Sequence, residues 1–140
     1  MDFKTEFFNK YTEGYKINKT YTIDKDSYNK FLDLFKDTSS IHTNIEYAKE
    51  RGFKDIIIHG SMLTGYLSNF TGTFFPGDRS FTQSVEVQFK APIYVNDRIK
   101  IECELTQMVE SVGVLILDFL IYNETQNYLS AEARIQTGIL

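Results

Sequence analysis

The strongest constraint on the fold is an alternation of apolar and polar residues that begins near Phe81 and recurs to the end of the chain. Apolar side chains occupy every second position in four runs: Val85-Val87-Phe89, Ile99-Ile101-Cys103-Leu105, Leu115-Leu117-Phe119 and Leu129-Ala131-Ala133-Ile135. A period of two places such side chains on one face of a β-strand. Turn-forming residues at Asn96-Asp97 and at 123–127 separate neighbouring runs. Four consecutive strands joined by short turns predict an antiparallel meander.

The first half of the chain has helical spacing instead. Thr22 or Asp24 can cap a helix whose apolar positions recur every three or four residues, at Tyr28, Phe31, Leu32 and Phe35. A polar loop over residues 36–43 follows, and Asn44 is a suitable N-cap for a short helix that ends at Gly52.

A third helix is expected after the apolar stretch Ile56-Ile57-Ile58 and the step His59-Gly60-Ser61. Its apolar side comprises Met62, Leu63, Tyr66, Leu67 and Phe70. Gly65 inside this helix costs about 1 kcal/mol relative to alanine and is typical of close packing, so we expect the helix to be buried against the sheet. The pattern predicts an α+β fold in which a curved antiparallel sheet wraps around a central helix.

Composition limits the class of protein. A chain of 140 residues with 42% hydrophobic and 24% charged residues fits a single globular domain over residues 1–140. The net charge of −4 and the lack of a basic run argue against a nucleic-acid partner. No stretch has the length and hydropathy of a membrane span or a secretion signal, so we expect no membrane association and, by default, a cytoplasmic location.

Cys103 is the only cysteine, which excludes an intramolecular disulfide and a cysteine zinc site. It lies on the apolar side of an alternating run, so a buried small hydrophobic residue is the favoured interpretation over a catalytic nucleophile.

The candidate chemistry lies between residues 37 and 60. Both histidines, His42 and His59, fall within this segment, and Asp37 precedes the first of them by five residues. A carboxylate and an imidazole can share proton-transfer work when both reach one substrate atom. Spacing alone favours a less specific interpretation, in which the aspartate caps local backbone amides and the histidine lies on the surface.

The wider segment is more specific. Residues 37–63 read DTSSIHTNIEYAKERGFKDIIIHGSML. This segment resembles the MaoC-like family of hot-dog-fold proteins, whose hydratases and dehydratases act on acyl thioesters. The family signature is an Asp, then Asn-Pro, an aliphatic residue and His, followed by an alanine in a short helix, a Gly-Phe pair and an Ile-x-His-Gly step. The matching positions, in order, are Asp37, Ile41, His42, Ala48, Gly52, Phe53, Ile57, His59 and Gly60.

The resemblance extends over approximately residues 14 to 138. Phe75-Pro76-Gly77 is similar to the family's turn after the central helix, and the stretch from Phe89 to Asp97 is similar to its strand and Gly-Asp turn. Asn96 replaces the glycine, and Asn tolerates the left-handed conformation better than most residues. The chain departs from the signature at Ser39-Ser40 in place of Asn-Pro, at Asn44-Ile45 in place of Asp-Pro, and at Ser61 in place of a large apolar residue.

The resemblance implies a single hot-dog domain with a hydratase/dehydratase site. The reaction that the resemblance implies interconverts a trans-2-enoyl thioester and an (R)-3-hydroxyacyl thioester. Asp37 and His42 would transfer protons, with Asp37 as the base on water, and the free N–H of Gly60 at the helix start would stabilise charge on the thioester oxygen. Ser39, His59 and Ser61 are candidate substrate-binding residues, although His59 also suits a purely structural role.

The resemblance also implies the partners. The substrate is a fatty acyl thioester, with CoA or acyl carrier protein as its handle, and the reaction needs neither a cofactor nor a metal. A homodimer or a higher oligomer built from such dimers is implied, with active sites at the interface. Two alternatives remain open at the level of sequence: a hot-dog acyl-CoA thioesterase that uses Asp37 as base or nucleophile, and a non-catalytic binding or assembly module.

Overall fold

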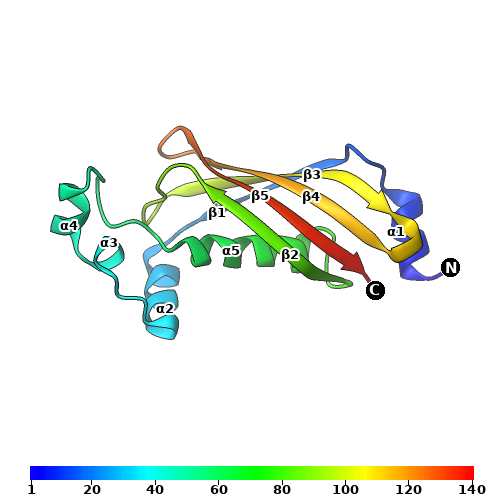
Figure 1. The fold of residues 1–140 in the computed structure, drawn as a ribbon, viewed down its shortest axis with the longest axis horizontal. Helices are drawn as coiled ribbons and strands as arrows, with labels where there is room; N and C mark the ends of the chain where they lie inside the picture. The colour runs from blue at the N-terminus through cyan, green and yellow to red at the C-terminus, as the bar shows by residue number, and fades with distance from the viewer.

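A computed structural model describes residues 1–140. One five-stranded antiparallel sheet curves around a central helix, α5 (Gly60–Asn69), which lies along its concave side (Figure 1). The strands are β1 (Lys16–Thr22), β2 (Ser80–Phe89), β3 (Arg98–Val109), β4 (Val114–Asn123) and β5 (Tyr128–Ile139). The α+β class and the curved sheet around a central helix, both predicted from the sequence, are confirmed.

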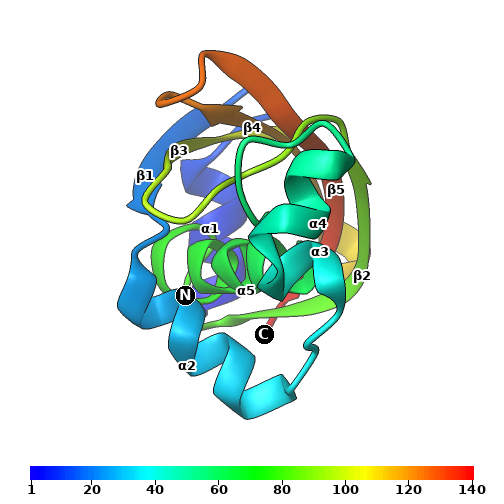
Figure 2. The same cartoon turned by 90° about the vertical axis from the view of Figure 1, so that its left-hand side faces the viewer.

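The predicted meander is correct for three strands and wrong for the fourth. The observed order is β1-β3-β4-β5-β2, so β2 pairs with β5 and not with its successor β3. Residues 90–97 form a connection that carries the chain from the edge strand β2 to β3, which lies beside the opposite edge strand β1. This connection passes the N-terminal end of α5 (Figure 2). It contacts the segment before that helix through a hydrogen bond from the N–H of Ile58 to the carbonyl of Ile93 and a bridge between Ile57 and Tyr94.

Two elements in the first third of the chain, β1 and α1 (Phe3–Lys10), were not predicted from the sequence. β1 pairs with β3 and was not predicted, because its side chains alternate between half-buried and exposed polar residues and give no apolar period. α1, capped by Asp2, was not predicted either. The remaining elements are the short helices α3 (Ser40–Thr43) and α4 (Ile45–Glu50), a π-helical turn η1 (Phe70–Phe74) that extends α5, and a 3₁₀ turn η2 (Glu110–Val112). No helix has the length and hydropathy to cross a membrane.

The predicted caps of two helices are confirmed. Asp24 accepts a hydrogen bond from the N–H of Ser27 at the start of α2 (Lys25–Phe35), and Asn44 accepts one from the N–H of Tyr47 at the start of α4. Gly52 follows α4 with a φ of 89°, a left-handed conformation that glycine adopts without steric cost. Lys36 ends α2 in a left-handed conformation with a φ of 57°, and Asn44 begins α4, so these two residues bound the loop between the helices.

The core lies between α5 and the concave face of the sheet. Met62, Leu63, Leu67 and Phe70 are buried there, as their helical spacing predicted, and Phe70 meets Phe119 of β4 edge to face at 5.4 Å. The alternating side chains of β3, β4 and β5 face them, including Cys103. Burial raises the pKa of the Cys103 thiol, which agrees with its interpretation as a small hydrophobic residue. Gly65 is an exception: it lies on the exposed side of α5 with open space around it.

A buried carboxylate holds the connection 90–97 in place. Asp97 accepts hydrogen bonds from the N–H of Tyr94, the amide of Asn123 and the amide of Gln126, at 2.9, 2.6 and 3.0 Å. Asn96 has a φ of 73°, the left-handed conformation that its resemblance to a Gly-Asp turn predicted. Because every oxygen of Asp97 is hydrogen-bonded, this turn fixes the loop that lies against the start of α5.

Candidate active site

The loop between α2 and α4 brings Asp37 and His42 to the start of α5, where His59 and Gly60 lie. A carboxylate oxygen of Asp37 and one ring nitrogen each of His42 and His59 all lie within 4.8 Å of one another. Asp37 is half exposed and His59 is fully buried. The residues that the sequence singled out over more than twenty positions therefore form one cluster.

Asp37 is held at one carboxylate oxygen and free at the other. Its Oδ1 accepts hydrogen bonds from the Ser39 hydroxyl at 2.8 Å and from the Ser39 N–H at 3.2 Å. These two hydrogen bonds hold the pKa of the Asp37 carboxyl below its usual value, with smaller contributions from His59 and His42. Oδ2 has no hydrogen bond, and its nearest ring nitrogen is Nε2 of His59 at 4.0 Å. An ionised carboxylate with one free oxygen can accept a proton from water.

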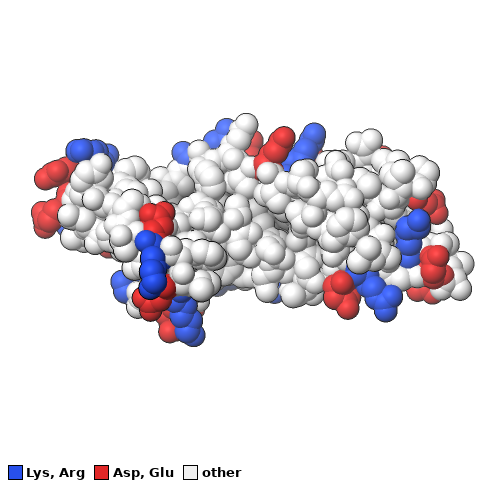
Figure 3. Space-filling model, turned by 60° about the horizontal axis from the view of Figure 1, so that its bottom comes forward, with Lys and Arg blue, Asp and Glu red and all other residues white.

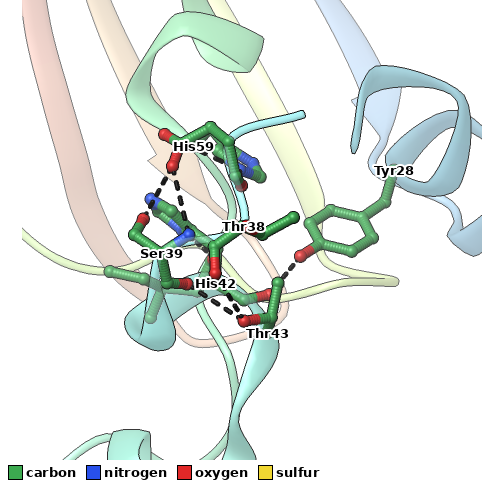
Figure 4. Close-up of polar contacts among 8 residues, drawn as sticks. Tyr28, Thr38, Ser39, His42, Thr43 and His59 are labelled. Carbon is green, nitrogen blue, oxygen red and sulfur yellow. Dashed lines mark hydrogen bonds and ion pairs between the residues drawn. The ribbon is translucent and has the colours of Figure 1, made fainter. Parts of the chain in front are cut away.

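His42 is fixed by its other ring nitrogen. Nδ1 lies 2.7 Å from the carbonyl oxygen of Ile57, an acceptor only, so Nδ1 carries the proton and Nε2 presents a lone pair. The tyrosine hydroxyl of Tyr28 donates to the backbone carbonyl of His42. Thr43 donates back to the carbonyls of Thr38 and Ser39, which closes the loop on itself (Figure 4). When Nδ1 carries the only ring proton, Nε2 of His42 can therefore accept a hydrogen bond.

His59 lies beneath both groups. Its ring stacks on that of His42, with centroids 3.8 Å apart and planes 25° apart. Its Nε2 lies 2.8 Å from the backbone carbonyl of Asp37. The side chain is 2% exposed, so the predicted role in substrate binding has little surface on which to act.

Gly60 begins α5, and its N–H has no acceptor within the chain. The N-terminal end of a helix carries free N–H groups and the positive end of the helix dipole, as the sequence led us to expect. A Cβ at this position would lie 2.7 Å from Cζ of Phe89, so the ring of Phe89 covers the helix start. Phe89 was not predicted to lie at the site, since nothing local to β2 indicates that its ring reaches α5.

Ser61 follows on the exposed side of α5. It lines a hollow that it shares with Asp37, Phe31, Phe35 and Thr64. Its hydroxyl has no hydrogen bond to Asp37 or His42, whereas Ser39 contacts Asp37 directly. The two candidate substrate-binding serines therefore differ in position: Ser39 supports the carboxylate, and Ser61 borders the hollow beside it.

Two cavities meet at Gly60 and Phe89. One, of about 420 Å³, is lined by His42, His59 and the loop from Lys90 to Ile93. The other, of about 580 Å³, runs between α5 and β2 and is bordered by Leu67, Ser68, Thr71, Val85 and Val87. An elongated ligand that spans both would pass the free N–H of Gly60.

The Asp37–His42–His59 cluster has donor types that bind metals, but its geometry suits a metal poorly. Two imidazoles bind one ion in the planes of both rings at about 2 Å. The stacked rings of His42 and His59 have nearly parallel planes, which cannot both contain one ion at that distance. In addition, Nε2 of His59 already donates a hydrogen bond to Asp37. The cluster fits proton transfer better than metal binding.

Comparison with known proteins agrees with this arrangement. The family model described as "MaoC like domain" matches residues 6–115. The (R)-specific enoyl-CoA hydratase of Rhodospirillum rubrum is 30% identical over 108 residues, which cover 77% of this chain and 75% of that protein. The (R)-specific enoyl-CoA hydratase of Aeromonas caviae is 28% identical over 94 residues, 67% of this chain and 70% of that protein.

Solved structures give the same fold. The (R)-hydratase from Aeromonas caviae superimposes with a TM-score of 0.84 at 22% identity, over 94% of this chain and 98% of that chain. An R-hydratase from Pseudomonas aeruginosa superimposes with a TM-score of 0.83 at 19% identity, over 94% and 84%. The sequence match covers the loop of Asp37 and His42 as well as the central helix, and the resemblance seen in the sequence is confirmed. The chain belongs to the MaoC-like dehydratase family of hot-dog-fold proteins.

Proposed function

We propose that the protein is a hydro-lyase that interconverts a trans-2-enoyl thioester and an (R)-3-hydroxyacyl thioester. The observation that carries this proposal is the pairing of a free carboxylate oxygen on Asp37 with a lone pair on His42, close to the unpaired N–H of Gly60. The hydratases and dehydratases among its relatives support the reaction type.

In hydration, a water molecule held between Asp37 and His42 attacks the β-carbon of the enoyl group. Its oxygen bonds to that carbon, and Asp37 takes one of its protons. The electron pair of the double bond moves toward the thioester carbonyl, whose oxygen gains negative charge. The N–H of Gly60 stabilises this oxygen. A proton from the Asp37–His42 pair then reaches the α-carbon, so the site ends as it began, and dehydration reverses these steps.

The two cavities suit the two ends of such a substrate. With the thioester at Gly60, the acyl chain would lie in one cavity and the handle would leave through the other. Lys90 borders the smaller cavity and offers a cation to a phosphate, a group common to CoA and to the phosphopantetheine of acyl carrier protein. The proposed chemistry uses side chains and one backbone N–H only, without a metal or cofactor.

We also propose a homodimer formed through β2 and the exposed side of α5. β2 is an edge strand of ten residues with a single charge, Glu86, whereas the opposite edge, β1, carries Lys16 and Lys19. A long edge strand with few charges is prone to pair with another strand. Figure 3 shows the underside of the molecule as drawn in Figure 1, and the middle of this face, beyond α2, carries few charged groups. A partner seated there would also wall the hollow that contains Asp37.

The test of function is incubation with crotonyl-CoA and longer enoyl-CoA substrates. Loss of the enoyl absorbance without release of free thiol is the expected result. Release of free thiol would identify a thioesterase instead, and a chain without either activity on a panel of enoyl and 3-hydroxyacyl thioesters would be a binding module.

The test of the site is a pair of substitutions. Asp37→Asn and His42→Ala should each lower kcat by about 10²- to 10⁴-fold, because each removes a proton-transfer group. Both side chains are at least partly exposed, so the melting temperature should change little. Wild-type turnover in both variants would show that the site is assigned to the wrong residues.

A further inference from the structure

His59 occupies the N-cap position of α5 without capping it. The N-cap favours Ser, Thr, Asp or Asn, whose short side chains accept a hydrogen bond from the first turn. The imidazole of His59 makes no such hydrogen bond. It turns away from the helix toward the loop of Asp37 and His42, and the identity of this residue therefore needs another explanation.

The first contact of the ring is with Asp37. Nε2 lies 2.8 Å from the carbonyl oxygen of Asp37, and since a carbonyl only accepts, Nε2 donates. This is the backbone of the same residue whose carboxylate is held by Ser39. His59 thus fixes the main chain from which the carboxylate projects. Nδ1 is buried and has no hydrogen-bond partner, so the contact at Nε2 is the only hydrogen bond of the ring.

The second contact is with His42. The two rings stack at 3.8 Å, and the ring of Phe31 lies 4.9 Å from His59. The hydrogen bond from Nδ1 of His42 to Ile57 is one attachment of the His42 ring, and the stack against His59 is a second. A ring held at one edge can still tilt, whereas a ring held at one edge and on one face cannot.

We infer that His59 is a positioning residue, which holds the Asp37 main chain and the His42 ring in one geometry without touching the substrate. This inference rests on the proposed hydro-lyase function. It differs from the sequence-based expectation that His59 binds substrate: although His59 borders the smaller cavity, only 2% of its side chain is exposed, which leaves almost no surface for a ligand to contact. Misplacement of catalytic groups by about 1 Å can cost about 100-fold in rate.

Two substitutions separate the hydrogen bond from the stack. In His59→Phe the flat ring remains, but the donor to Asp37 is lost. In His59→Gln the terminal amide can still donate to Asp37, and the stack is lost. Leu117→Ala in β4 is the matched control, since Leu117 is equally buried and lies in the core of the sheet.

We expect His59→Phe to lower kcat by about 10- to 100-fold with KM changed by less than about threefold, and His59→Gln to recover part of that loss. In His59→Phe the main chain of Asp37 loses the hydrogen bond from His59, so the hydrogen bonds from Ser39 to the carboxylate weaken and the pKa of Asp37 rises. The acid limb of the pH–rate profile should therefore move to higher pH. The titratable groups facing Asp37 are His42, His59 and Tyr28. Leu117→Ala should lower the melting temperature and leave kcat and the pH profile unchanged. A His59→Phe variant with wild-type kcat would overturn the inference, as would a rise in KM alone.

A second measurement does not depend on turnover or on how a variant folds. In the wild-type protein, imidazole ¹⁵N spectra should show His59 with its proton on Nε2, and amide hydrogen exchange should protect the N–H of His42, which donates to the carbonyl of Ser39. A proton on Nδ1, or a His42 amide that exchanges freely, overturns the positioning role whatever the substrate is. If these spectra agree and no enoyl thioester reacts, the proposed function fails while the geometry of the site stands.

Discussion

Ser39 donates two hydrogen bonds to one oxygen of Asp37, at the position where the family signature has an asparagine. The serine hydroxyl and N–H both reach Oδ1, so the carboxylate is anchored in this chain without that asparagine. The proline of the signature is also absent, at Ser40, and the loop is closed instead by Thr43, which donates to the carbonyls of Thr38 and Ser39. The departure that left a non-catalytic module open thus preserves the contacts a base needs.

Ser39→Ala should move the acid limb of the pH–rate profile to higher pH. The Ser39 hydrogen bonds favour the ionised carboxylate and hold the pKa of Asp37 below its ordinary value. Without the hydroxyl the pKa rises toward that value, so Asp37 becomes protonated, and inactive as a base, at a higher pH than in the wild type. At neutral pH the carboxylate is ionised in both proteins, and kcat should change little.

Ser40→Ala is the control for this substitution. Ser40 neighbours Ser39, is exposed, and its hydroxyl has no hydrogen-bond partner. Its pH–rate profile should match that of the wild type. An unmoved acid limb in Ser39→Ala would mean that the hydroxyl does not act on Asp37.

The sequence predicted which residues would come together at the candidate site, but it did not predict their contacts. Asp37, His42 and Gly60 were found from a motif, and the structure brings them together. The acceptor for His42 is a backbone carbonyl of Ile57, and the hydroxyl donor to the loop is Tyr28, which the helical period had placed among core residues. Backbone acceptors carry no residue-type signal, and a periodic tyrosine gives no sign that its hydroxyl leaves the core.

At the scale of elements, the start of α5 tests the role of a single N–H. Gly60→Pro should lower kcat by about 100- to 1000-fold relative to Gly60→Ala. Proline is tolerated at the first helical position, where its missing N–H has no partner within the helix. His59, which precedes it, already has the extended φ and ψ of −67° and 139° that proline requires of its neighbour.

Gly60→Ala is the matched control because both variants add a Cβ 2.7 Å from Cζ of Phe89. Phe89 is 58% exposed and can move, so each variant displaces its ring to a similar extent. The ratio of the two rates then reports the N–H alone. Equal rates in the two variants, at similar melting temperatures, would remove Gly60 from the mechanism.

The order of strands was harder to predict than their existence. Sequential pairing of neighbours is common, and three of the four predicted strands obey it. β2 does not, because residues 90–97 cross the end of α5 and deliver the chain to the far side of the sheet. The signal for that crossing is the buried Asp97 with its three donors, which becomes visible only once Asn123 and Gln126 lie beside it.

At the scale of the whole molecule, one chain leaves a continuous apolar and small-residue face open. It combines the β2 edge with the exposed residues Ser61, Gly65 and Ser68 of α5. The sequence indicated that Gly65 permits close packing, and within one chain nothing packs on it. A second copy seated on this face would provide that packing and would bring its own β2 alongside.

Val85→Lys should therefore weaken the dimer. Val85 is 45% exposed on β2 and borders the cavity between β2 and α5, so a partner would have to bury the new charge. Each 1.4 kcal/mol lost raises the dimer dissociation constant about tenfold. Sedimentation or light scattering should give about twice 16.3 kDa for the wild type and a mass that falls on dilution for the variant.

Val112→Lys is the control, since Val112 is 67% exposed in η2, away from this face. Because a partner would wall the hollow at Asp37, turnover should fall in step with the dimer fraction in Val85→Lys and not in Val112→Lys. A Val85→Lys protein that stays dimeric at every concentration would place the interface on another surface.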